Sequence, residues 1–177
     1  MTILRIDSSI NGGNSASRAL TDSIVEQLKA SNWGEQLVTR DLVANPLPHL
    51  TLEAFADTSV LDEFLAADIV VIGAPMYNFT VPTQLKSWLD RLAVAGKSFC
   101  YTADGPEGLL GGKRVIVALA SGGVYEEGGL FEHQKSYLKA FFNFLGIEPE
   151  FVSAFGVGMA PDEALERADA EILALAA

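Results

Sequence analysis

Two stretches of the sequence consist almost entirely of apolar, mostly β-branched residues, and they restrict the possible fold more than any other feature. The first, DIVVIGAP, covers residues 68–75, and the second, GKRVIVALAS, covers residues 112–121. A strand with one face in water alternates apolar and polar residues, whereas a strand of a parallel sheet is covered on both faces and reads as a continuous apolar run. The two stretches therefore predict central strands of a sheet that carries helices on both faces.

Strand and helix patterns alternate along the rest of the chain. Further strands are predicted at 2–7, 35–42 and 149–157. The helical patterns have apolar residues three or four apart: one carries Leu20, Ile24 and Leu28, and the others cover 51–67 with a break near 57–59, 82–93, 133–146 and 161–177. Five strands interleaved with helices predict an α/β fold, a doubly wound parallel sheet. Since no repeat or linker interrupts the pattern, a single domain is predicted over residues 1–177.

The charge balance excludes several classes of partner. Lys and Arg number 12 against 23 Asp and Glu, a formal net charge of −11, so we expect neither nucleic acid nor a membrane as partner. The acidic excess is typical of a surface that keeps a protein in solution. A lone cysteine, Cys100, excludes an intrachain disulfide and a cysteine-based zinc site. The N-terminal residues have no signal-peptide pattern, which favours a cytoplasmic enzyme or carrier.

In doubly wound sheets, ligands bind outside the carboxyl ends of the strands, and the first such end here leads into the loop SSINGGNSASR. The backbone amides at the start of the following helix, together with the helix dipole, attract anions. Ser9, Ser15 and Ser17 add hydroxyl donors. The loop is neither a Walker A motif nor a GxGxxG motif. It predicts a pocket for a monophosphate, with an ordinary Ser-capped helix start as the alternative.

The second loop, at residues 75–81, contains Met76, Tyr77, Asn78 and Phe79. A flavin offers a planar ring whose face needs apolar contact and whose edge needs hydrogen-bond partners. A Met thioether and aromatic rings can contact the face, and the Asn78 amide can both donate and accept at the edge. In the alternative interpretation, Met76 and Phe79 simply continue the core.

The third loop, ASGGVYEEGG at residues 120–129, follows the fourth predicted strand. Gly122 and Gly123 would let the backbone approach a bound ring. The sequence has two histidines, no GxSxG motif and no metal-ligand spacing, so the side chains provide few acid–base groups. The three loops together predict a mononucleotide cofactor that supplies the reactivity.

Several longer motifs carry a resemblance to a known family: RDLVANPLPHL, APMYNFTVPTQLKSWLDR, FCYTADGPEGLLGGK and FFNFLGI. With them the sequence resembles, nearly from end to end, the FMN-dependent NADH:azoreductases, which are flavodoxin-like quinone reductases. The resemblance implies a flavodoxin-like sheet of strand order 2-1-3-4-5, a homodimer and one FMN per subunit. It also implies ping-pong hydride transfer from NADH, or NADPH, to a quinone or an azo compound.

The resemblance also assigns site residues. It places the FMN phosphate at Ser9, Ser15, Ala16 and Ser17, the ring at Met76, Tyr77, Asn78 and Phe79, and the third contact at Ala120, Ser121, Gly122 and Gly123. Asn78 is the expected catalytic residue of this loop. Tyr101 is the second, because its segment reaches the partner's active site in relatives.

Two departures from the family pattern are expected to affect the substrate pocket or dimer edge and the contacts near the flavin. The region between PHL and DIVVIGAP is shorter than in typical relatives, and the third loop reads Ala-Ser-Gly-Gly where many relatives have Ser-Arg-Gly-Gly. The sequence leaves open the physiological acceptor and the choice between NADH and NADPH. A flavodoxin-type electron carrier without enzymatic activity fits the fold and the acidic charge equally well. Phosphodiester hydrolysis is disfavoured, because metal ligands and a nucleophile–base pair are missing.

Overall fold

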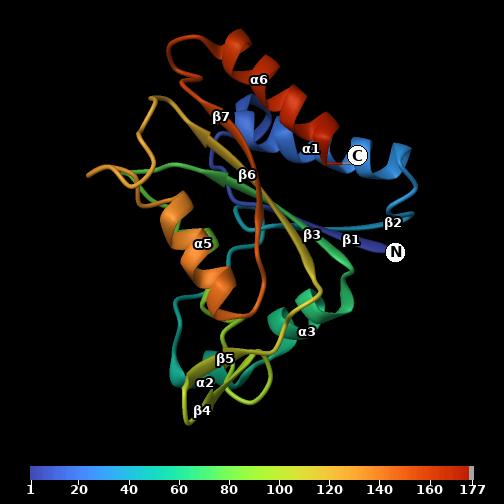
Figure 1. Ribbon diagram of the computed structural model, residues 1–177, viewed down its shortest axis with the longest axis vertical. Helices are drawn as coiled ribbons and strands as arrows, with labels where there is room; N and C mark the ends of the chain where they lie inside the picture. Colours follow the sequence, from blue (N-terminus) through green and yellow to red (C-terminus); the bar gives the residue numbers. More distant parts are fainter. Residues whose placement is uncertain (176–177) are drawn as a thin grey trace.

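The computed structural model describes residues 1–175, in which five parallel strands form the central sheet (Figure 1). In chain order they are β1 (Thr2–Asp7), β2 (Gln36–Asp41), β3 (Ile69–Pro75), β6 (Arg114–Ser121) and β7 (Glu150–Phe155). Across the sheet they lie in the order β2-β1-β3-β6-β7. This order confirms the predicted 2-1-3-4-5 arrangement of the five strands. The winding direction reverses between β1 and β3, where such sheets place their ligands.

Helices cover both faces of the sheet. On one face lie α1 (Ala16–Ala30) and α6 (Pro161–Ala174), side by side in Figure 1. The helices α3 (Ser59–Ala66), α4 (Thr83–Leu89) and α5 (Lys135–Phe144) pack on the other face, and a short helix, α2 (Leu52–Ala56), precedes α3. Among the described residues, no helix has the length and apolar character needed to cross a membrane.

The central strand β3 shows why the apolar runs predict this architecture. All seven of its residues are buried. Val70 and Ile72 belong to the core between the sheet and α3, α4 and α5, whereas Ile69 and Val71 belong to the core beneath α1 and α6. Successive side chains of a strand point to opposite faces, so a strand that serves two cores must be apolar at every position.

The ends of two helices differ clearly from the predictions. The helix predicted at 82–93 starts at Thr83, with Pro82 as its N-cap residue, and ends at Leu89. Beyond it, the N–H groups of Arg91 and Leu92 donate to the carbonyl three residues earlier, as in a tight turn. The helix predicted at 133–146 is shorter at both ends, and Gly146, with φ of 85°, terminates it. The break predicted near 57–59 is confirmed, because the Asp57 carboxylate accepts the Ser59 N–H at the start of α3. Residues 176 and 177 of the predicted last helix lie outside the described residues.

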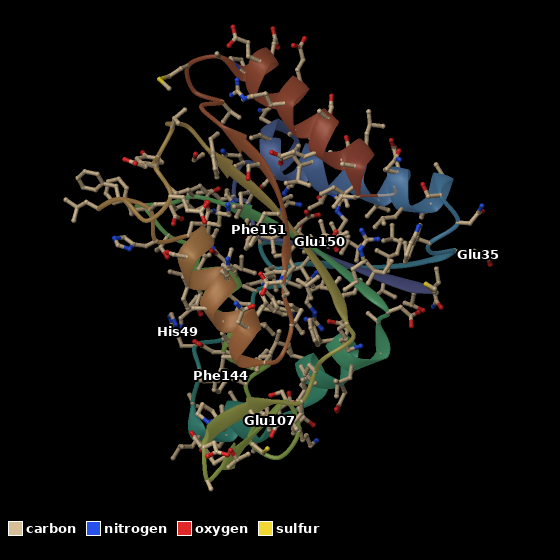
Figure 2. The ribbon with its side chains drawn as sticks, viewed as in Figure 1. Glu35, His49, Glu107, Phe144, Glu150 and Phe151 are labelled. Carbon is tan, nitrogen blue, oxygen red and sulfur yellow. The ribbon has the colours of Figure 1, made fainter. Side chains whose placement is uncertain are left out.

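The structure also contains an antiparallel hairpin that the sequence analysis missed, β4 (Phe99–Thr102) and β5 (Gly105–Gly108). It lies against the C-terminal end of α5, beside Phe144 (Figure 2). The ring centroids of Phe99 and Phe144 are 4.6 Å apart. The Asp104–Gly105 pair at its turn is a recognised hairpin signal, and Gly105 has a φ of 121°. That dipeptide could have revealed the hairpin.

Candidate functional site

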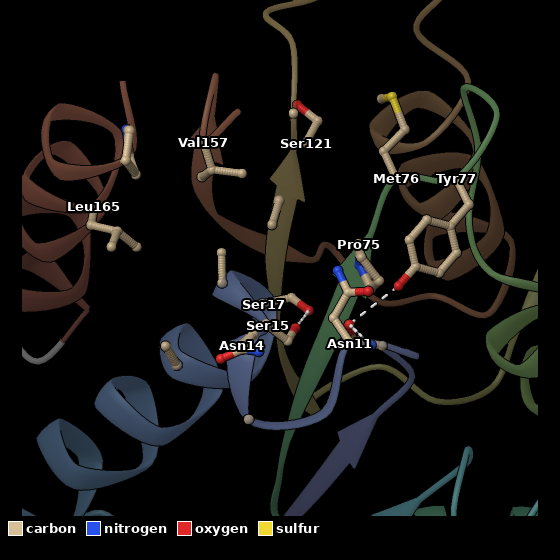
Figure 3. A pocket seen from close by; sticks show the side chains of 17 residues that line it. Asn11, Asn14, Ser15, Ser17, Pro75, Met76, Tyr77, Ser121, Val157 and Leu165 are labelled. Atoms are coloured by element: carbon tan, nitrogen blue, oxygen red, sulfur yellow. Dashed lines mark hydrogen bonds between the residues drawn. The ribbon is translucent and has the colours of Figure 1, made fainter. Parts of the chain in front are cut away.

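A cavity of about 440 Å³ lies at the carboxyl ends of β1, β3 and β6 (Figure 3). Its lining brings together nine of the residues predicted for cofactor binding: Ser9, Ser15, Ala16, Ser17, Met76, Tyr77, Ala120, Ser121 and Gly122. A smaller adjoining cavity of about 220 Å³ shares Met76, Ser121 and Gly122 and adds Asn78, Phe79 and Tyr125. All three predicted loops therefore meet at one place, and the larger cavity is in the size range of small-molecule sites.

One end of the larger cavity is formed by the start of α1. Ser15 is the N-cap residue of this helix, and its Oγ accepts a hydrogen bond from the Arg18 N–H. The buried hydroxyls of Ser15 and Ser17 lie 3.1 Å apart. The first amides of a helix have no partner within it, and those of Ala16 and Ser17 find no backbone partner elsewhere in residues 1–175. None of the described residues that line this cavity is charged, so an anion here would meet neutral donors and the helix dipole.

Tyr77 joins the second loop to the first. Its hydroxyl shares a hydrogen bond of 3.2 Å with Ser9 Oγ and accepts one of 3.1 Å from the Ile10 N–H. Ser9 Oγ in turn accepts from the Asn11 N–H. Tyr77 lines the cavity, and its hydroxyl links the first and second loops.

Asn78 and Phe79 occupy the two central positions of a tight turn. Both have positive φ, 48° and 73°, and Tyr77 and Thr80 exchange backbone hydrogen bonds on either side of them. This is the type I′ geometry, which Asn tolerates and which strains Phe. Phe79 is nevertheless held there: its ring packs against Tyr125 and Phe131, and its carbonyl accepts the His133 N–H.

The second loop does not belong to the core. Phe79 is 41 % exposed and Met76 is half-buried, and neither is a member of the two core clusters. The alternative that these residues merely continue the core is therefore wrong. Strained residues of this kind gather at functional sites, where the surrounding structure keeps them in place.

The third loop is shaped by the turn that follows β7. The Gly158 N–H donates to the Gly122 carbonyl, and the Gly156 N–H donates to the Ser121 carbonyl. A Cβ on Gly122 would meet no atom within 4 Å, whereas one on Gly123 would lie 3.2 Å from the Tyr125 ring. Open space beside the Gly122 backbone is what a close approach of a ligand requires.

Two predicted site residues are not brought to the cavity within one chain. Gly123 lies in the third loop but lines neither cavity. Tyr101 is 77 % exposed on β4 and packs on Phe99. Figure 1 shows its hairpin at the opposite end of the molecule from the carboxyl end of β6.

Sequence reasoning also missed part of the lining. Asn11, Gly13 and Asn14 stand in the quoted Ser- and Gly-rich loop, and its composition could have named them. Val157, Pro161 and Leu165 come from the turn after β7 and from α6. Ordinary apolar residues after a fifth strand carry no motif, so nothing in the sequence marks these three as part of the wall.

Together the fold and the cavity define a flavodoxin-like α/β protein with a candidate site for a mononucleotide. The comparisons with known proteins give the family. Residues 1–176 match the family model described as "Flavodoxin-like fold". The FMN-dependent NADH:quinone oxidoreductase 2 of Bradyrhizobium diazoefficiens is 46% identical over 183 residues, covering 92% of this chain and 91% of that protein. The FMN-dependent NADH:quinone oxidoreductase 1 of Xanthomonas euvesicatoria is 47% identical over 186 residues, covering 99% and 94%.

A solved structure agrees with these relatives. The FMN-dependent NADH-azoreductase from Bacillus anthracis, crystallised in complex with FMN, superimposes with a TM-score of 0.85 at 28% identity, covering 99% of this chain and 98% of that one. The chain belongs to the flavodoxin-like family of FMN-dependent NADH:quinone oxidoreductases and azoreductases.

Proposed function

We propose that this protein is an FMN-dependent oxidoreductase that passes electrons from NADH to quinones. The proposal is supported by the names of relatives 46–48% identical to the chain. The single observation that carries it is the meeting of the three loops around one cavity. We further propose that the chain is a single domain over residues 1–177, that it acts as a homodimer in the cytoplasm, and that it follows a ping-pong order. Aromatic azo compounds are proposed as a second class of acceptor.

The residues present fit FMN in both charge and shape. The buried hydroxyls of Ser15 and Ser17, with the free amides at the start of α1, suit a phosphate. Met76 and Phe79 offer thioether and aromatic contacts for a planar ring, and the open side of Gly122 leaves room for it. FMN, when bound, supplies the two-electron chemistry that the side chains of this site lack.

The chain's own groups have three tasks in this proposal. The start of α1 holds the phosphate, and the Asn78 amide and nearby backbone N–H groups hold the ring edge where negative charge develops. The aromatic cluster of Phe79, Tyr125 and Phe131 borders the place where a flat acceptor aligns.

Anaerobic titration with NADH and NADPH tests the proposed activity. We expect FMN-loaded protein to lose its yellow absorbance with one equivalent of NADH and to regain it on addition of a quinone. If photoreduced protein instead holds a long-lived one-electron reduced form, and neither nicotinamide bleaches it, the protein is an electron carrier and the proposal is wrong.

Replacing Asn78 by alanine is expected to weaken FMN retention or to slow turnover, because the side-chain amide at the ring edge is lost. Alanine at a φ of 48° also costs about 1–2 kcal/mol of strain. Asn78→Gly is the matched variant, since glycine adopts this conformation without strain. We expect both variants to show the same functional defect, and only Asn78→Ala to show a lower melting temperature. Full activity of the Asn78→Gly variant would show that the Asn78 amide is not part of the proposed site.

Tyr101 is proposed to act in the partner's site, since its hairpin lies far from the cavity of its own chain. Tyr101→Ala should change the kinetics with the acceptor while FMN content and the rate of reduction by NADH stay constant. Glu107→Ala, an exposed position on the paired strand of the same hairpin, serves as the control. If Tyr101→Ala loses FMN instead, the assignment to the acceptor step is wrong.

A further inference from the structure

Arg18 is the third residue of α1, and its guanidinium lies on the side of the first loop that faces away from the proposed phosphate site. It is absent from the lining of the 440 Å³ cavity and lines a second cavity on the other side of the loop. Ser9, Gly13 and Ala19 line both cavities, so the loop and the first turn of the helix separate the two. The Arg18 guanidinium thus donates to groups of the protein itself and does not line the cavity.

The guanidinium holds the entry of the loop. Its Nε and Nη2 both donate to the Ser9 carbonyl, at 3.3 and 2.9 Å. Ser9 is the second residue of the quoted loop SSINGGNSASR and Arg18 is its last, so these two hydrogen bonds join the two ends of a ten-residue segment that borders the cavity. The Ser9 hydroxyl also contacts Tyr77, but the second loop has anchors of its own, because the Met76 N–H donates to the Ala120 carbonyl and the Phe79 carbonyl accepts the His133 N–H.

Asp41 at the end of β2 fixes the guanidinium in turn. Its two oxygens accept from Arg18 Nη1 at 2.7 Å and Nη2 at 3.0 Å. Asp41 Oδ1 also accepts the N–H groups of Val43 and Ala44. The hydrogen bonds from Arg18 lower the pKa of Asp41 to about 2, so its carboxylate stays charged at neutral and mildly acidic pH.

We propose that Arg18, held by Asp41, is a positioning residue that fixes the shape of the phosphate loop without contacting the phosphate. The inference rests on the proposed function, because it needs FMN as the ligand. It explains how a phosphate site lined by neutral residues can be pre-organised: the fork of the guanidinium joins the Ser9 carbonyl and the Asp41 carboxylate to the first turn of α1. Lysine carries the same charge but cannot form this fork.

Arg18→Lys is therefore expected to weaken FMN binding by about tenfold or more, which equals about 1.4 kcal/mol and lies within the contribution of one charge-assisted hydrogen bond. Riboflavin has the same ring but no phosphate, so its affinity should change less than about twofold. The ratio of the FMN and riboflavin affinities separates an effect on the phosphate loop from a general destabilisation of the whole flavin site. Asp41→Asn is the second variant, because it keeps an acceptor for Val43 and Ala44 and loses the ion pair.

Arg114 and Glu150 provide a matched control. They form an equally bidentate pair, with Nε–Oε1 at 2.7 Å and Nη2–Oε2 at 3.0 Å, at the amino ends of β6 and β7. Arg114→Lys removes the same fork far from the cavity and should leave both affinities unchanged.

The experiment is a fluorescence titration of the flavin-free wild type and variants with FMN and with riboflavin. Circular dichroism first shows that each variant is folded like the wild type. A selective loss of FMN affinity in Arg18→Lys, or in Asp41→Asn if the first variant does not fold, supports the inference. Equal affinities, or equal losses for both flavins, overturn it while leaving the proposed function intact. Failure of the wild type to bind FMN at all would instead refute the proposed function and the inference with it.

Discussion

Replacing Ala16 by aspartate is expected to abolish FMN binding at micromolar concentrations while the chain stays folded. Ala16 is the first residue of α1, half-buried in the cavity wall. A carboxylate at a helix start is favoured by the helix dipole, so stability should not fall. The same carboxylate would occupy part of the phosphate position and repel the phosphate dianion in a partly desolvated site. We expect a loss of affinity of about 100-fold or more, close to 2.7 kcal/mol, measured by quenching of flavin fluorescence.

Ser59→Asp controls for the added charge, because Ser59 is the exposed first residue of another helix, α3. It should bind FMN as the wild type does. If Ala16→Asp also binds FMN with unchanged affinity, the phosphate does not lie at the start of α1, and the orientation of the cofactor in the cavity would have to be reassigned.

The largest effect on stability is expected from Gly108→Ala. A Cβ at Gly108 would lie 2.1 Å from the backbone N of Gly146 and 2.1 Å from the backbone C of Leu145. These are backbone atoms at the end of α5, so no side-chain rotation relieves the contact and the hairpin must move away from the helix. Overpacking of this kind costs about 3 kcal/mol, which lowers the melting temperature by about 6 to 12 °C in a chain of this length.

Gly111→Ala is the matched variant on the same segment. Its Cβ would meet the Gly146 carbonyl oxygen at 3.6 Å, an ordinary contact, so thermal unfolding should be nearly unchanged. An equal melting temperature for Gly108→Ala and the wild type would show that the hairpin is not fixed on α5 in the way described.

The sheet could be predicted from the sequence because its signal is local and repeated. Every residue of β3 is buried, and each of its positions must be apolar to serve one core or the other. The two helical layers follow from the same rule, and right-handed crossovers restrict the strand order to a few choices. The particular order 2-1-3-4-5 is implied by the resemblance to the family. The β4–β5 hairpin escaped because two short, mostly exposed strands have no such pattern.

The candidate site could be predicted only in part, for a similar reason. Residues that bind through backbone amides and hydroxyls cluster in Ser- and Gly-rich loops, and seven of the nine predicted residues that line the cavity come from such loops. Val157 and Leu165 line the same cavity from the turn after β7 and from α6, and their presence there depends on three-dimensional packing alone. The ion pair of Arg18 and Asp41 joins residues 23 positions apart, and nothing in the sequence indicates that these two side chains interact.

The proposed function requires that the cavity at the strand ends holds FMN. Equilibrium titration of flavin-free wild-type protein with FMN, followed by flavin fluorescence, tests this directly. We expect saturation at one FMN per chain with a dissociation constant in the micromolar range or below, and much weaker binding of riboflavin, which lacks the phosphate. Flavin fluorescence that stays unchanged at micromolar protein and FMN would contradict the account.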